Sequence, residues 1–166
     1  MGVSGCGKST TGALLAGRLS WPFRDADSFH PPGNIEKMSR GTPLTDEDRA
    51  PWLSAIAAWI DGRLAAGERG IVSCSALKRA YRDAILGSRR GVRLVFLKGD
   101  KALIATRMAA RLDHFMPPAL LDSQFATLEE PAPDENPLVV PVSPQPGEVV
   151  ETILRELGLK PSPGPG

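Results

Sequence analysis

A glycine-rich segment at the start of the chain has the residue types and spacing of a phosphate-binding loop. Residues 2–9, GVSGCGKS, match the pattern G-x-x-x-x-G-K-[ST] at every fixed position, and a helical pattern follows. Glycines let successive backbone N–H groups turn toward a phosphate chain, and the positive end of the helix adds attraction. We expect Lys8 to reach the β- and γ-phosphates and the Ser9 hydroxyl to ligate Mg²⁺. The segment therefore predicts binding of a nucleoside triphosphate; a chance glycine-rich turn is the alternative.

This loop alone does not separate kinases from GTPases, motor ATPases or switches. The sequence has no N-K-x-D-like guanine-recognition segment, and 166 residues are too few for most motor domains. What remains is the nucleoside-monophosphate-kinase type, which phosphorylates a small molecule beneath a mobile, arginine-bearing lid. Such an enzyme must exclude water during transfer, because otherwise it hydrolyses ATP without forming product.

Two carboxylates, Asp25 and Asp27, end a predicted strand over residues 23–27. Because they are two residues apart, they share one face of that strand. At the carboxyl edge of a parallel sheet, one of them can orient a substrate hydroxyl toward the γ-phosphate or accept its proton. We favour Asp27, which lies closer to the loop that follows. Solvated acids at a strand end are the alternative interpretation.

Cationic side chains in two further segments suit an anionic substrate. Arg49 ends an acid-rich segment and can clamp a substrate carboxylate with its planar fork. A capping arrangement of Thr45 and Asp48 explains the same segment structurally. Lys78 and Arg82 are four residues apart on one predicted helical face, where they either hold an anion or are simply solvated.

A third cationic pair, Arg107 and Arg111, is also spaced four residues apart and precedes His114. This is the design of a lid whose cations meet phosphates as charge develops in the transition state. An exposed basic helix edge is the alternative. We expect His114 to be a structural lid residue, and no cluster of His, Cys and Asp has the spacing of zinc ligands.

The elements that must position these residues alternate between short apolar runs and helical patterns. This alternation predicts an α/β fold of three layers, with parallel strands and helices on both faces. We expect a single domain over residues 1–159 and a disordered tail over 160–166, because KPSPGPG offers nothing to bury. The predicted strands are 23–27, 71–74, 93–97 and 138–142, and the predicted helices are 8–19, about 35–38, 51–64, 76–86, 101–112, part of 115–129, and 148–157.

Composition excludes several classes of partner. Lys and Arg number 20 against 19 Asp and Glu, so the net charge of +1 gives no electrostatic case for nucleic acid or an anionic membrane. The longest uncharged stretch, around residues 138–146, is too short and too rich in proline to span a bilayer. Two cysteines, Cys6 and Cys74, cannot build a disulfide scaffold, and no signal peptide is visible. We therefore expect a cytoplasmic protein.

Taken together, these segments resemble the gluconate kinases of the thermoresistant type. The resemblance rests on GVSGCGKST, DADSFHPPGNIEKMSRGTPLTDEDRAPWL, CSALKRAYRD and HFMPPALLDSQFATLEEP, which occur in this order from Gly2 to about Val140. It implies phosphorylation of D-gluconate to 6-phospho-D-gluconate with ATP and Mg²⁺. It also implies a homodimer, a P-loop kinase fold around a five-stranded parallel core, and a helical lid at about 107–130.

The resemblance assigns roles to the matching residues. Lys8, Asp27 and Arg107 are implied to be catalytic, and Ser9 to hold the metal. A pocket that mixes cations with acceptors suits gluconate, a polyol with one carboxylate; the implied substrate contacts are Asp27, His30, Arg49, Lys78 and Arg82. The implied nucleotide contacts are Gly2, Ser4, Gly5, Cys6, Gly7, Lys8, Ser9, Thr10, Arg107 and Arg111.

The chain departs from the family's pattern in three places. Cys6 stands where Ser is usual, and because its backbone N–H matters most, we expect activity to survive with added sensitivity to oxidation. Pro141 stands where the family often has Asp, and it cannot donate a ladder hydrogen bond. In the family an apolar central strand leads into the loop, whereas here Met1 directly precedes Gly2. We expect that strand to be missing, the neighbouring strands to lack its hydrogen bonds, and the native start to lie upstream.

Two alternatives stay open at this point. The first is a kinase for a related hydroxy acid such as shikimate, although HPPGNIEKM and CSALKRAYRD match gluconate kinases in detail. The second is a non-catalytic nucleotide-binding protein derived from a kinase. The intact set of Lys8, Ser9, Asp27 and Arg107 weighs against this second alternative.

Overall fold

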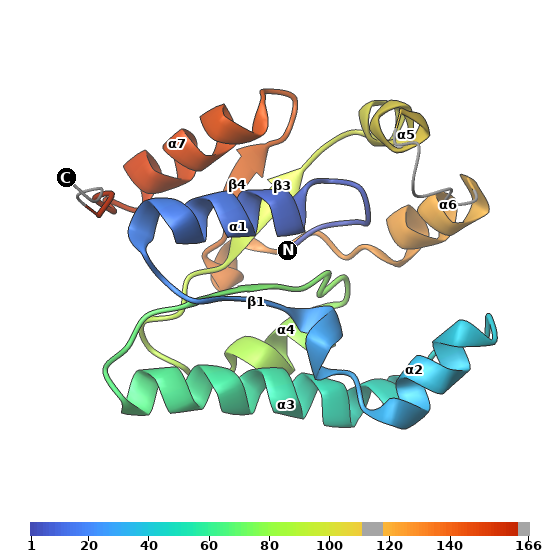
Figure 1. Cartoon of the computed structure of the whole chain (residues 1–166). Coiled ribbons are helices and arrows are strands. Elements are labelled where there is room, and N and C mark those ends of the chain that lie inside the picture. The colour runs from blue at the N-terminus through green and yellow to red at the C-terminus, as the bar shows by residue number, and fades with distance from the viewer. Residues whose placement is uncertain (111–117, 163–166) are drawn as a thin grey trace.

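Short parallel strands lie between two layers of helices in the computed structural model, which describes residues 1–110 and 118–162 (Figure 1). One layer holds α1 and α7, the other holds α3 and α4, and the predicted three-layer α/β class is confirmed. The strands are β1 (Phe23–Asp25), β2 (Ile71–Ser73), β3 (Val95–Lys98) and β4 (Leu138–Pro141). The helices are α1 (Lys8–Leu19), α2 (Pro32–Ser39), α3 (Asp46–Ala65), α4 (Arg79–Leu86), α5 (Lys101–Ala109), α6 (Pro118–Thr127) and α7 (Pro146–Glu156), with short 3₁₀ turns at Ala26–Phe29 and Pro133–Glu135.

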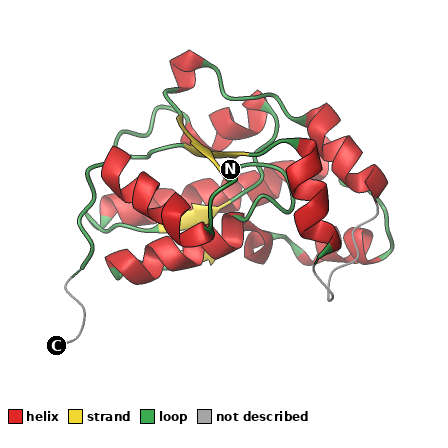
Figure 2. Cartoon of the chain, turned by 90° about the horizontal axis from the view of Figure 1, so that it is seen from above, coloured by secondary structure: helices red, strands yellow, loops and turns green. Residues whose placement is uncertain are grey.

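The strands form two parallel pairs, which stand apart in Figure 2. β1 pairs with β2 so that Asp25 lies opposite Ser73, and β3 pairs with β4 so that Lys98 lies opposite Pro141. Pro141 has no N–H, but Val142 N donates to Lys98 O at 2.9 Å, so the pairing continues past the proline. The described strands therefore do not form the continuous five-stranded core that the resemblance implied.

Met1 and Gly2 occupy the gap between β2 and β3. The Met1 α-amino group donates to Val95 O at 2.6 Å and Leu97 N donates to Met1 O at 3.0 Å, which is the pattern of a parallel ladder. On the other side, Gly2 N donates to Ser75 O at 3.2 Å. Within the described residues, no backbone hydrogen bond joins β2 directly to β3. Met1 and Gly2 therefore supply part of the central-strand hydrogen bonding that we expected β2 and β3 to lack.

A cavity of about 660 Å³ opens between the two pairs and extends along β2 and β3. Its lining runs from Gly70 and Leu94, which directly precede β2 and β3, to Lys8, Ser73 and Cys74 at the carboxyl ends of the strands. Apolar side chains make up much of its wall, including Leu15, Trp21, Ile60, Val92, Ile153 and Leu157. The middle of the molecule is therefore incompletely filled. The side chains that line the cavity lose the dispersion contacts that atoms opposite them would make.

Two buried apolar clusters fix the layers against the strands. The cluster beneath α1 and α7 includes Ile104, Val140 and Ile153, each at most 1% exposed. The cluster against α3 and α4 includes Ile56, which is 0% exposed, and Trp52. Burying a side chain of this size stabilises the fold by about 1.5–3 kcal/mol. Each cluster thus supports one wall of the site described below.

Helix α3 begins at Asp46, five residues before the start that we predicted from Pro51. Thr45 and Asp48 form a capping box, with Asp48 N donating to Thr45 Oγ1 at 3.2 Å and Thr45 N donating to Asp48 Oδ2 at 3.0 Å. These bonds satisfy N–H groups at the helix start, so the cap rather than the proline sets the boundary. The capping interpretation of the acid-rich segment is confirmed.

The end of the described chain is attached to the fold. Ser162 lies in the segment that we expected to be disordered, yet its amide donates to Arg18 O at 2.9 Å and its hydroxyl to Leu19 O at 2.7 Å. Residues 163–166 lie outside the described residues. In the part of the chain that the structure describes, no helix is long and apolar enough to cross a membrane.

Candidate active site

The phosphate-binding loop turns tightly and ends in the first residue of α1. Gly5 and Gly7 have φ angles of 81° and 95°, in the left-handed region that favours glycine. No side chain caps α1, so its first-turn N–H groups remain available to an anion. Lys8 Nζ donates to Val3 O at 3.0 Å, which holds the ammonium group over the loop. Backbone and lysine together form an anion-binding concavity.

The side chains of this loop point in different directions. Cys6 is 2% exposed and packs in the apolar cluster beneath α1, and its backbone N–H donates to Val3 O at 3.3 Å. Thr10 is exposed at the start of α1. A Cβ at Gly2 would come within 2.8 Å of Leu97 O, so only glycine fits where the loop crosses β3.

Asp25 is the carboxylate that faces the phosphate-binding loop. Its Oδ2 accepts from Ser9 Oγ at 2.6 Å and from Ser73 Oγ at 2.9 Å, and its Oδ1 accepts from Asp27 N at 3.1 Å. Burial raises the pKa of Asp25, but these hydrogen bonds outweigh it, so the pKa lies below its ordinary value and the group is charged at neutral pH. Hydroxyl and carboxylate oxygens are ligands that Mg²⁺ prefers, so Ser9 and Asp25 fit a magnesium ion.

Asp27 and His30 form a second part of the site, on the short turn after β1. Asp27 is exposed, and within the described residues no hydrogen bond or ion pair engages its carboxylate. His30 stacks on Trp52 with ring centroids 4.6 Å apart and an interplanar angle of 9°, and Asn34 Nδ2 lies 3.4 Å from its Nδ1. Burial lowers the pKa of His30, against the opposing charge of Asp27, so the ring is neutral at pH 7.

The amino-terminal ends of α3 and α4 bring a third group of side chains together. Lys78 Nζ lies 3.0 Å from both carboxylate oxygens of Asp46, and the Tyr81 hydroxyl donates to the same carboxylate. The Arg49 guanidinium lies 5.7 Å from the Tyr81 ring centroid, and Lys78 Nζ lies 5.3 Å from it. Arg49 makes no hydrogen bond or ion pair with another described residue. Two of the predicted substrate cations, Arg49 and Lys78, are therefore neighbours of one tyrosine.

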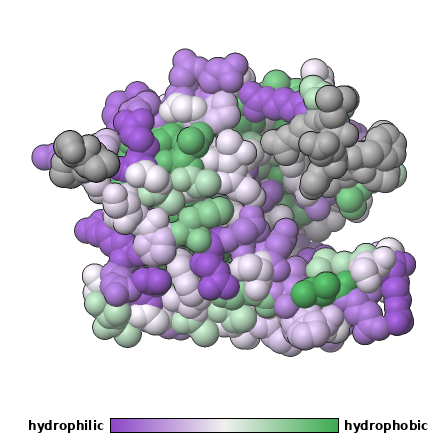
Figure 3. Space-filling view, viewed as in Figure 1, coloured by the Kyte–Doolittle hydropathy of each residue, from purple (hydrophilic) through white to green (hydrophobic). Residues whose placement is uncertain are grey.

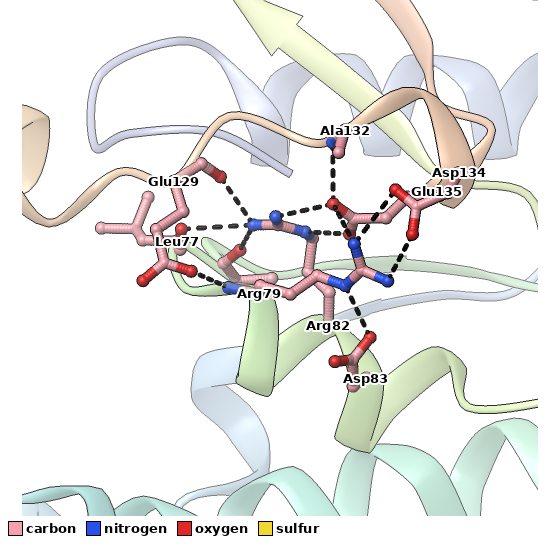
Figure 4. Close-up of polar contacts among 9 residues, drawn as sticks. Leu77, Arg79, Arg82, Asp83, Glu129, Ala132, Asp134 and Glu135 are labelled. Atoms are coloured by element: carbon pink, nitrogen blue, oxygen red, sulfur yellow. Dashed lines mark hydrogen bonds and ion pairs between the residues drawn. The ribbon is translucent and has the colours of Figure 1, made fainter.

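Arg82 does not join this group, and our prediction that it contacts substrate is wrong for this structure. Its side chain is 1% exposed and pairs with Glu135, whose side chain is 4% exposed (Figure 4). Spacing suggested that Arg82 and Lys78 share a helical face, but Lys78 is the residue before α4 and Arg82 is inside the helix on its buried side. The Arg82 guanidinium is therefore buried and paired, and it is not available to a ligand in this structure.

The predicted lid cations are only partly within the described chain. Arg107, on α5, donates from Nη2 to Ser143 O at 3.2 Å and to Pro144 O at 3.3 Å, in the loop between β4 and α7. It therefore contacts that loop, and not the phosphate-binding loop, in this structure. Arg111 and His114 lie outside the described residues.

Residues that the sequence interpretation left out also contact the phosphate-binding loop. Ser4 N donates to Gln124 Oε1 at 2.9 Å, which joins the loop to α6. A Cβ at Gly5 would come within 2.6 Å of Met108, so α5 packs directly on the loop. No local pattern distinguishes Gln124 or Met108 from other helical residues, because their partner lies about a hundred residues away in sequence. Asp25 was visible in the sequence as one of two carboxylates at the end of a predicted strand, but we assigned the role in the site to its neighbour Asp27.

The site as a whole places a phosphate-binding loop across from carboxylates and cations suited to a small polar molecule. Figure 3 shows the molecular surface hollowed above α2, which is the helix that follows Asp27 and His30 along the chain. Lys8, Ser9 and Asp25 lie at the carboxyl ends of parallel strands, where α/β proteins bind ligands. These features define the class of P-loop kinases that act on small molecules.

The comparisons with known proteins give the family. A model of the shikimate kinase family matches residues 4–157, and the chain belongs to this family of P-loop kinases, which are phosphotransferases acting on an alcohol group. The chain is 45% identical over 155 residues to a gluconokinase of Gluconobacter oxydans (strain 621H), covering 93% of this chain and 87% of that one. It is 41% identical over 155 residues to the thermoresistant gluconokinase of Escherichia coli (strain K12), covering 92% and 89%. A crystal structure of a gluconokinase from Sinorhizobium meliloti 1021 superposes with a TM-score of 0.82 at 47% identity, covering 95% and 89%. The predicted resemblance to gluconate kinases is confirmed.

Proposed function

We propose that this protein transfers the γ-phosphoryl group of ATP to the primary hydroxyl of D-gluconate, with Mg²⁺, and releases 6-phospho-D-gluconate. The observation that carries the proposal is the pairing of two sites. Lys8, Ser9 and Asp25 suit a triphosphate and its metal, and Arg49 and Lys78 suit a carboxylate. Gluconate has one carboxylate and a chain of hydroxyls, and the names of the similar proteins support the same substrate.

The nucleotide end of the site is built from backbone and three side chains, Lys8, Ser9 and Asp25. The N–H groups of the loop and of the first turn of α1 hold the phosphates, and Lys8 adds a charge near the β- and γ-phosphates. Ser9 and Asp25 would hold Mg²⁺, which would neutralise charge on the phosphate oxygens. Because the pKa of Asp25 is depressed, its carboxylate keeps its charge throughout the neutral range.

The acceptor end of the site orients one hydroxyl. Arg49 and Lys78 bind the sugar-acid carboxylate, Arg49 through its two-pronged fork and Lys78 as a point charge. Asp27 accepts a hydrogen bond from the reacting hydroxyl and directs its oxygen toward the γ-phosphate, while neutral His30 contacts a neighbouring hydroxyl. Positioning of this kind supplies most of the catalysis in phosphoryl transfer.

The chain forms a single domain over residues 1–159. Within it, a lid over about residues 107–130 excludes water from the reacting groups. Arg107 turns from the carbonyls of Ser143 and Pro144 toward the nucleotide when the lid closes. The proposed nucleotide contact of Arg111 lies outside the described residues. We further propose that the enzyme is a cytoplasmic homodimer without nucleic-acid partners, supported by the balanced charge, the two cysteines and the family resemblance.

A coupled assay that detects 6-phosphogluconate tests the proposal. The protein is supplied with ATP, Mg²⁺ and either gluconate or shikimate, and ATP hydrolysis without acceptor is measured alongside. Turnover with gluconate and not with shikimate is expected. Turnover with shikimate alone would assign the other specificity, and tight ATP binding without turnover of either acid would favour the non-catalytic alternative.

A further inference from the structure

Arg82 is buried away from the acceptor site, yet its guanidinium makes an extensive set of hydrogen bonds. Nε and Nη2 bind the two carboxylate oxygens of Glu135, at 2.5 and 2.9 Å. Nη1 donates to three backbone carbonyls, those of Ala76 at 3.0 Å, Leu77 at 3.2 Å and Glu129 at 2.9 Å (Figure 4). A planar guanidinium presents five donors in a fixed fork, and here the fork is used on both sides.

These acceptors come from two segments that are far apart in sequence. Ala76 and Leu77 belong to the loop over residues 74–78, which ends in Lys78 and is here called the substrate loop. Glu129 and Glu135 belong to the segment over residues 128–135 that follows α6, here called the return segment. Arg82 therefore holds one segment against the other from inside α4.

The same two segments are joined by further hydrogen bonds around Arg82. Glu129 N donates to Leu77 O at 2.8 Å, and Arg79 N donates to Glu129 Oε2 at 2.6 Å. The second bond occupies a free N–H at the start of α4, where Lys78 provides no side-chain cap. Ala76 has a φ of 45°, a backbone conformation that side chains other than glycine rarely adopt. The hydrogen bond to its carbonyl holds this strained turn in place.

We propose that Arg82 and Glu135 are positioning residues that fix the substrate loop and thereby set Lys78 in the acceptor site. A buried ion pair is in general a weak contribution to stability, because desolvation offsets the attraction. Positioning of the substrate loop better explains why all three carbonyl partners of the Arg82 guanidinium lie in the substrate loop and the return segment. The inference rests on the proposed gluconate kinase activity for its kinetic consequence, but its structural part is independent of that activity.

The proposal predicts a selective loss at the acceptor end of the site. Arg82→Lys keeps the positive charge but loses the fork, and Glu135→Gln keeps the shape but loses the charge. In both variants we expect the KM for gluconate to rise about tenfold or more, because charge-assisted bonds are removed beside Lys78. The dissociation constant of a fluorescent ATP analogue should change by less than about twofold, since no hydrogen bond in the described chain joins Arg82 to the phosphate-binding loop.

Asp134→Asn is the matched control for Glu135→Gln. Asp134 is the adjacent carboxylate, but its side chain is 66% exposed and it pairs with Arg79 at the surface. We expect this variant to keep the wild-type KM, because an exposed pair contributes little. An equal rise in KM in both carboxamide variants would overturn the proposal.

Glu135→Gln also separates positioning from direct contact. If Arg82 binds the sugar acid itself, removing the competing carboxylate frees the guanidinium, and the KM for gluconate falls or stays unchanged. That result would overturn the proposal, as would a loss of ATP affinity that parallels the rise in KM. A rise in KM alone supports positioning.

Amide hydrogen exchange measured residue by residue keeps the structural part testable if the wild-type protein does not phosphorylate gluconate. In Arg82→Lys the amides of Arg79 and Glu129 should exchange faster, while those of β3 and β4 should not. Unchanged exchange at Arg79 and Glu129 refutes the role of Arg82 in holding the loop, whatever the substrate. Wild-type inactivity with gluconate contradicts only the proposed function.

Discussion

Replacing Asp25 by Asn tests the assignment of the metal side of the site. The substitution keeps the size and a hydrogen-bond acceptor for Ser9 and Ser73, but it removes the negative charge. For each unit of metal charge at about 4 Å, a carboxylate contributes about 1 kcal/mol in bulk water and about 4 kcal/mol at an effective dielectric of about 20. Mg²⁺ carries two units of charge, so the limits for this ion are about 2 and about 8 kcal/mol. Because Asp25 is only partly buried, we expect a value toward the lower limit, about 3 kcal/mol, or roughly a hundredfold weaker Mg²⁺ binding.

The assay is the initial rate of 6-phosphogluconate formation as Mg²⁺ is varied, with ATP and gluconate held saturating. Asp25→Asn should shift the half-saturating Mg²⁺ concentration upward by about a hundredfold, with part of the rate restored at high Mg²⁺. Asp27→Asn makes the same chemical change two residues further along the chain. It should leave the Mg²⁺ dependence within about twofold of wild type and lower kcat by about a hundredfold, because Asp27 orients the acceptor hydroxyl.

The reverse pattern of effects would refute the assignment of Asp25 to the metal and Asp27 to the acceptor hydroxyl. If Asp27→Asn raised the Mg²⁺ requirement and Asp25→Asn lowered only kcat, the carboxylate bonded to Ser9 would not be the metal ligand. Equal effects of both substitutions on Mg²⁺ would place both carboxylates around one ion. A depressed pKa keeps Asp25 charged in the wild type at neutral pH, so protonation does not confuse the comparison.

Three further outcomes are expected. Lys8→Ala should abolish turnover while leaving the melting temperature near that of the wild type; substantial remaining turnover would contradict its phosphate-binding role. Gln124→Ala removes one hydrogen bond, so we expect a loss of about 0.5–1.5 kcal/mol in the free energy of unfolding and weaker ATP binding, whereas Gln124→Glu, which keeps the acceptor oxygen, should be nearer wild type in both measurements. Fusing an apolar segment of about six residues ahead of Met1 should fill the cavity between β2 and β3 and raise the melting temperature, and a fused segment of alternating aspartates should not.

The features that the sequence predicted well are those set by neighbouring residues. The extent of α1 follows from Gly7 and from the apolar pattern after Lys8, and the predicted range of 8–19 agrees with the structure. Thr45 and Asp48 are three residues apart, so their capping box was visible in the sequence. The start of α3 was nevertheless misplaced, because Pro51 was taken as the first helical residue although the cap at Thr45 satisfies the helix start.

The features that the sequence could not predict depend on distant partners. Arg82 and Lys78 have the same charge and a favourable spacing, and only Glu135, 53 residues away, decides that Arg82 is buried. The contact of Arg107 with the β4–α7 loop likewise depends on Ser143, 36 residues away. Periodicity identifies which residues share a helical face, but it does not identify what covers that face.

The cavity extends from the amino ends of β2 and β3 to Lys8, Ser73 and Cys74 at the edge of the candidate site, but hydrogen bonds at the carboxyl ends position the reacting groups, so stability and chemistry can be tested separately. At the carboxyl ends the two strand pairs are held together by short links: Gly2 to Ser75, Ser9 to Asp25, and Glu129 to Leu77. At the amino ends the cavity replaces such links. Filling the cavity should therefore change the free energy of unfolding far more than kcat, because the links that position reacting groups are already made. An added strand that changed kcat without changing the melting temperature would contradict this separation.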